Sequence, residues 1–194
     1  NLMDLMKLLT EQLGNEDILS KLGGKAGVDK EQVKQVAMMG LPTLVKAMDR
    51  NASTKEGAEA LAKALEQHKD DDVEDLNGYF DKVDTDDGAK ILQHILSGKD
   101  TSFKNNLASK TGLQSDQVSG IMTQLAPMLL GMMGKEKAKR GAGPDDISGL
   151  LGDMIGQGKG GGLMDIAEGL LDADKDGSIV DDVGKLFGGL FKKK

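Results

Sequence analysis

Apolar residues recur along most of the chain at the spacing of amphipathic α-helices. The longest such stripes span residues 33–48 and 118–133, where apolar side chains stand three or four positions apart. Shorter stripes cover residues 53–65, 87–98 and 144–155, and a capping residue or a proline stands near the start of each. Leu, Met and Ala dominate the apolar residues, and aromatic residues are only 3%. The pattern therefore predicts an all-α, multihelical fold.

The two long stripes belong to an internal repeat. Glycine, glutamine, proline and apolar positions of residues 22–48 recur 85 positions later, in residues 107–133. Each copy predicts a short helix, a glycine turn and a longer helix. The proline should kink or split that longer helix, because proline cannot donate the helical hydrogen bond. We expect the two repeats to occupy about residues 16–66 and 101–155.

The remaining sequence divides at a glycine-rich segment. Residues 156–162 contain five glycines, which is typical of a flexible linker. We therefore expect a helical domain over residues 1–155 that contains both repeats. A small C-terminal unit should follow over residues 163–194, with an Asp-rich loop between two helices.

The Asp-rich loop, residues 172–182, has the spacing of a calcium-binding loop. Acidic side chains stand at its positions 1, 3 and 5, a glycine at position 6 permits the chain to reverse, and position 7 offers a backbone carbonyl. Val183 occupies position 12, where such loops carry a bidentate acid, so Asp181 or Asp182 would have to close the site. The metal ligands that we predict are Asp172, Asp174, Asp176, Ser178, Asp181 and Asp182.

The alternative for this loop is a solvated helix start, since residues 178–181 also fit a capping box. Three carboxylates at alternate positions repel one another unless a cation lies between them, and this favours calcium binding. Mg²⁺ fits less well, because the loop offers many oxygen ligands rather than a few with water.

The charge pattern bears on nucleic-acid binding. The formal net charge is −7 at pH 7, and the acidic excess lies in residues 69–75 and 81–87. Each repeat also fits a helix-turn-helix spacing, which makes a DNA-binding regulator an alternative. The helix that would read the bases, residues 114–120, carries Asp116, Gln117 and Ser119 rather than cations, so we do not expect nucleic acid to bind. The other acidic group, residues 81–87, would cap the helix that follows or bind a cation, and capping is the better supported.

Little in the composition supports catalysis. The chain has no Cys, which excludes thiol chemistry, and its two His residues, His68 and His94, leave almost no material for a histidine-based metal centre. Residues 156–161 match the GxGxxG motif, but neither a predicted strand nor a βαβ unit accompanies the motif. We expect His68 at the surface and His94 at a rim or bonded to a partner. The sequence therefore predicts a protein that is not an enzyme.

Two apolar features could serve protein partners or self-assembly. Methionine pairs at residues 38–39 and 132–133 could form an adaptable groove, although core filling explains them better. The C-terminal segment, residues 183–194, places apolar residues beside terminal lysines and could dock on protein. No apolar run approaches the ~20 residues of a membrane span. No signal peptide is visible, so we expect a cytoplasmic protein that does not bind membranes.

The order of these motifs carries a family resemblance. It comprises the segment of residues 86–96, the duplicated glycine–proline segments, the glycine-rich linker and the Asp-rich loop of residues 172–182. Together they resemble the bacterial family of unknown function that is related to YidB-like proteins, while the loop resembles an EF-hand or dockerin loop in its first eight positions. The family resemblance implies an all-helical fold and a bacterial source. It implies no activity and no catalytic residues.

Overall fold

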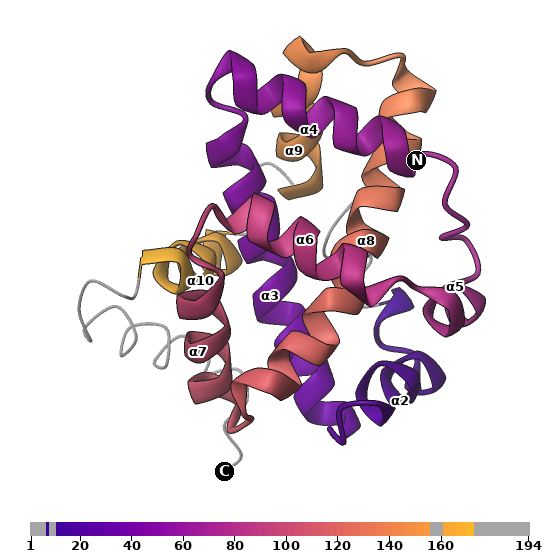
Figure 1. The fold of residues 1–194 in the computed structure, drawn as a ribbon, viewed down its shortest axis with the longest axis vertical. Coiled ribbons are helices and arrows are strands. Elements are labelled where there is room, and N and C mark those ends of the chain that lie inside the picture. The colour runs from indigo at the N-terminus through magenta and orange to yellow at the C-terminus, as the bar shows by residue number, and fades with distance from the viewer. Residues whose placement is uncertain (1–6, 8–10, 156–160, 173–194) are drawn as a thin grey trace.

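A computed structural model describes residues 7, 11–155 and 161–172 of the chain (Figure 1). The part of the chain described in this way is built of helices and contains no β-strand, which confirms the predicted all-α class. Its elements, in order, are α2 (Glu16–Gly24), α3 (Lys30–Asn51), α4 (Lys55–His68), α5 (Leu76–Lys82), α6 (Thr85–Leu96), α7 (Asp100–Thr111), α8 (Ser115–Arg140), the 3₁₀ turn η2 (Pro144–Asp146), α9 (Ile147–Ile155) and α10 (Gly161–Asp172).

The two longest helices, α3 and α8, form the centre of the molecule (Figure 1). Residues 39–45 of α3 and 121–131 of α8 are buried without exception, so both helices are enclosed on every side over these segments. Helices α4 and α6 pack on α8, whereas α9 and α10 pack on α3. A helix that is apolar all round belongs in a core, and the two repeats supply this core.

Both central helices run through their prolines without a break. Helix α3 contains Pro42 within its 22 residues, and α8 contains Pro127 within its 26. The expected split therefore does not occur. A proline removes one helical hydrogen bond, whereas each of these segments is held by packing on all sides.

The turns that precede α3 and α8 have the same conformation. Gly27 has φ of 69° and Gly112 has φ of 75°, a region in which residues with a side chain are strained. In each turn the amide of the next residue donates to the carbonyl five residues earlier, at 3.0 Å in the first copy and 3.1 Å in the second. The glycine turns of the two repeats are therefore equivalent in structure as well as in sequence.

Two reciprocal hydrogen bonds join these turns to each other. Gln32 Nε2 donates to the carbonyl of Thr111 at 3.1 Å, and Gln117 Nε2 donates to the carbonyl of Ala26 at 3.2 Å. Both the donors and the acceptors are 85 residues apart in sequence. Two copies related by a two-fold axis would make this reciprocal pair of hydrogen bonds. The pair therefore supports the interpretation of the repeat as a duplication.

Residues 53–56 have the sequence of a capping box that would begin with Ser53, but helix α4 begins one residue later than this box predicts. The hydroxyl of Thr54 accepts a hydrogen bond from the amide of Gly57 at 3.0 Å, so Thr54 is the cap. Ser53, the first residue of the predicted box, instead donates to the carbonyl of Arg50 at 2.7 Å. Ser53 therefore closes the end of α3.

Helix α10 packs on α3 and α7. Its residues Leu170 and Leu171 are buried, and Glu168 forms an ion pair with Lys46 of α3 at 3.2 Å. The side chain of Asn106 in α7 donates to the carbonyl of Leu170 at 3.3 Å. The first helix of the expected C-terminal unit thus contributes to the same core as the repeats. The proposed division into residues 1–155, 156–162 and 163–194 stays a prediction.

Candidate functional site

Two glycines allow α4 and α6 to lie close against α8. A methyl group at Gly88 of α6 would stand 1.9 Å from the carbonyl oxygen of Thr123, and one at Gly134 of α8 would stand 2.4 Å from the carbonyl oxygen of Leu65. Neither position can accept a side chain without movement of backbone. Helices α4 and α6 are consequently fixed on the same helix with a space between them.

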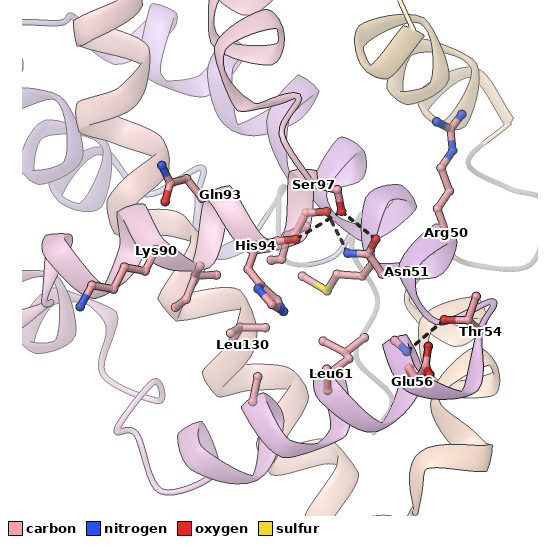
Figure 2. A pocket seen from close by; sticks show the side chains of 16 residues that line it. Arg50, Asn51, Thr54, Glu56, Leu61, Lys90, Gln93, His94, Ser97 and Leu130 are labelled. Carbon is pink, nitrogen blue, oxygen red and sulfur yellow. Dashed lines mark hydrogen bonds between the residues drawn. The ribbon is translucent and has the colours of Figure 1, made fainter.

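That space is a groove with an apolar floor and a volume of about 790 Å³ (Figure 2). The floor is formed by the buried side chains of Met48, Leu61, Ile95 and Leu130, which come from α3, α4, α6 and α8. We call this site the α4–α6 groove. Its volume lies in the range of pockets that take ligands, and its floor is apolar as such sites require.

Small residues on α4 keep the groove wide. Gly57, Ala60 and Ala64 line it at helical spacing, and Ala60 is exposed to solvent. Gly57 has no room for a side chain, because a methyl group there would stand 1.7 Å from the carbonyl oxygen of Asn51. The opposite wall is Ile91 of α6, which is only partly buried. The walls therefore leave apolar surface open between them.

Polar groups close one corner of the groove and join α3 to α6. Asn51 Nδ2 donates to the carbonyl of Ile95 at 2.9 Å, and the hydroxyl of Ser97 donates to Asn51 Oδ1 at 3.2 Å (Figure 2). Ser97 holds a left-handed conformation with φ of 51°, which ends α6. These bonds fix the last turn of α3 against the last turn of α6, so that the groove has a rigid end.

Charged side chains stand at the two ends of the groove. Lys90 lies at one end, and Glu56 and Arg50 lie at the opposite end, near the start of α4 (Figure 2). The exposed ring of His94 points from α6 toward Leu130 and Leu61, which confirms the prediction that it is a rim residue. The groove therefore combines an apolar floor with charged side chains of both signs at its rim. The sequence sign of this groove is the row of small residues at positions 57, 60 and 64, which lie on one face of a helix. The apolar residues of the same helix predict a buried face, and for that reason the small residues did not by themselves indicate a groove.

The other histidine is more buried than its charged surroundings in the sequence suggest. His68 ends α4, and its side chain is only 16% exposed. Its Nδ1 lies 2.7 Å from Asp71 Oδ2, and its Nε2 lies 3.5 Å from Asp87 Oδ2. The expected surface position is wrong, because the segment after α4 and the start of α6 enclose the ring. Burial, and then the charges of Asp71 and Asp87, raise the pKa of the neighbouring Tyr79 above its usual range.

The acidic residues 81–87 are dispersed by the fold. Asp84 caps α6, where its carboxylate accepts from the amides of Asp86 and Asp87 at 3.0 and 3.1 Å. Asp81 instead pairs with Lys21 of α2 at 2.9 Å. The capping prediction is therefore confirmed. No group of three or more metal-ligating side chains is arranged around a common point in the part of the chain that the structure covers.

The Asp-rich loop falls almost wholly outside the described residues. Asp172 is the last residue of α10. The other predicted ligands, Asp174, Asp176, Ser178, Asp181 and Asp182, lie beyond it. Calcium binding at this loop therefore stays a prediction.

The helix-turn-helix alternative gains no support from the geometry. Gln32 and Gln117, the polar residues with the best chemistry for reading bases, are engaged in the hydrogen bonds that join the two turns. The exposed residues beside them include Glu31 and Asp116, whose carboxylates repel phosphate.

The methionines are largely core residues. Met39, Met122, Met128 and Met133 are buried, whereas Met38 and Met132 are partly buried against the same core. Core filling, rather than a methionine-lined groove, is therefore their main role.

Taken together, the described residues define a multihelical bundle with an apolar groove between α4 and α6, which both pack on α8. The chain belongs to a family of bacterial proteins of unknown function (DUF937), whose model matches residues 7–136. The match includes the whole α4–α6 groove. No curated protein and no solved structure matches the chain. Among the helices of the described ranges, none combines the length and the hydropathy that crossing a membrane requires.

Proposed function

We propose that the protein is a non-enzymatic binding protein whose α4–α6 groove receives an amphipathic helical segment of a protein. The observation that carries the proposal is the groove between two fixed helices, with the buried Leu61, Ile95 and Leu130 at its floor and the partly exposed Ile91 on its wall. A helix that places its apolar face in such a groove is a recurrent mode of protein recognition.

The dimensions of the groove favour a short helix over an extended strand. Its wall on α4 runs from Thr54 to Ala64, which corresponds to about 15 Å at 1.5 Å per residue. Three residues of α4 that line the groove are small, namely Gly57, Ala60 and Ala64. The backbone of a bound helix could therefore approach α4 closely. A bound helix makes its own backbone hydrogen bonds. A bound strand would need the edge of a sheet, and the described residues contain no sheet.

A selection with short amphipathic peptides tests this function. The target is the chain truncated after residue 178, which retains every described residue, and the comparison is the same chain with Ala60→Trp. The matched control is Ser20→Trp, since Ser20 is also exposed but lies on α2. Selected peptides should carry apolar residues at helical spacing, and Ala60→Trp alone should abolish binding. Equal binding to both variants would refute the groove as the site.

A second role is proposed for the Asp-rich loop, on the evidence of its ligand spacing. Asp172, Asp174, Asp176, Ser178, Asp181 and Asp182 would bind Ca²⁺ and thereby stabilise the C-terminal unit by mass action. Calorimetric titration of Ca²⁺ into chelator-treated protein tests this role. Asp174→Ala and Asp176→Ala should each remove the binding heat, and a wild-type chain that releases none would refute it. The likeness of this loop to an EF-hand stays a prediction, as does the relation of the chain to YidB-like proteins.

A further inference from the structure

We infer that the α4–α6 groove is occupied by the C-terminal segment of the same chain, residues 183–194. The inference rests on the proposed function of the groove and names the segment that fills it. Three independent properties point to this segment: the spacing of its apolar residues, its two phenylalanines and its distance from the groove along the chain.

The apolar residues of the segment have the spacing of a groove-binding helix. Leu186, Phe187, Leu190 and Phe191 stand at positions i, i+1, i+4 and i+5, which lie on one face of a helix. In helical form the stretch from Val183 to Phe191 would be about 12 Å long, close to the length of the α4 wall. It therefore matches the groove in both its pattern and its length.

The phenylalanines of the segment also favour its burial. The chain has four Phe and no Trp, and Phe80 and Phe103 are completely buried in the core. The other two are Phe187 and Phe191. Burial of a Phe side chain is favourable relative to its exposure, and the apolar groove above Leu61, Ile95 and Leu130 offers such burial.

The end of α10 lies within reach of the groove. Asn106 of α7 holds the carbonyl of Leu170, and α7 begins at Asp100, three residues after the groove residue Ser97. From Asp100 to Asn106 the helix rises about 9 Å. The ten residues 173–182 can span up to about 33 Å. An extended connection is therefore long enough to reach the groove.

Engineered cysteines test the inference, because the natural chain has none. Full-length protein with Ala60→Cys and Leu190→Cys places one thiol in the groove and one in the segment. The control pairs Leu190→Cys with Ser20→Cys on α2, at the other end of the molecule from α4 (Figure 1). Under mild oxidation the first pair should form its intramolecular disulfide at least about tenfold faster, because docking raises the effective concentration of the two thiols. Adding Phe187→Asp and Phe191→Asp should reduce that rate to the control value.

Two outcomes would overturn the inference. Equal disulfide rates for the two pairs would mean that the segment does not dock in the groove. Disulfide-linked dimers that form faster than the intramolecular bond would assign the groove to a second copy. Circular dichroism of each variant at 222 nm verifies that the helices are intact. A groove that still binds selected peptides, in a chain whose cysteine pairs react alike, would refute this inference and leave the proposed function in place.

Discussion

The close contact between α6 and α8 can be tested by adding one methyl group. Gly88→Ala would place a Cβ atom 1.9 Å from the carbonyl oxygen of Thr123, 2.8 Å from its carbonyl carbon and 3.1 Å from its Cα atom. Real Cβ contacts are essentially never shorter than 3.0 Å, so α6 would have to move away by about 1 Å. The atoms that the new methyl group would meet belong to the backbone of a buried helix, so no change of rotamer can relieve the clash.

The expected loss of stability follows from two opposing effects. Overpacking of this kind costs about 1–3 kcal/mol, and the upper end applies because backbone rather than a side chain is displaced. The replacement of Gly by Ala in a helix returns up to about 1 kcal/mol. The net loss should be about 2 kcal/mol, which for a chain of this size lowers the Tm by about 4–8 °C.

Urea unfolding followed by circular dichroism at 222 nm measures this loss. The matched control is Gly149→Ala in α9, where an added methyl group meets nothing within 4 Å. The control should gain about 0.5–1 kcal/mol from helix propensity alone. The two substitutions should therefore shift the unfolding midpoint in opposite directions. A Gly88→Ala protein as stable as the wild type would refute the close packing of α6 on α8.

Three further predictions concern caps, titration and the repeat. Thr54→Ala should cost about 1 kcal/mol in urea unfolding, whereas Ser53→Ala should cost much less. Because the folded state raises the pKa of Tyr79, its phenol contributes stability below pH 10 that is lost as the pH rises further. Tyr79→Phe should flatten this alkaline loss, as thermal unfolding between pH 9 and 11 would show. Gln32→Ala and Gln117→Ala should each cost about 1 kcal/mol, and a marked inequality would contradict their equivalence.

The sequence predicted the features that depend on local order. Helical periodicity located α3 and α8, and the paired glycines located the turns before them. These predictions succeeded because a helical stripe or a glycine with positive φ is determined by neighbouring residues. Capping of α6 by one of the acidic residues 81–87 was predicted for the same reason, and the structure shows that this residue is Asp84.

The features that depend on tertiary packing could not be predicted in this way. The floor of the groove combines Met48, Leu61, Ile95 and Leu130, which are far apart in sequence and meet only after α3, α4 and α6 have packed on α8. His68 is enclosed because Asp87, nineteen residues later, returns to it. The span of α8 across Pro127 likewise reflects the core around it rather than its local sequence.

Methyl NMR of Met48 tests the central claim, that the α4–α6 groove receives the apolar C-terminal segment, most directly. Met48 lines the groove, while Met39 is buried elsewhere on α3 and serves as the internal reference. A peptide of residues 179–194 would be titrated into the chain truncated after residue 178. The account predicts a saturable shift of the Met48 methyl signal with Met39 unchanged. A Met48 signal that stays in place at millimolar peptide would contradict it.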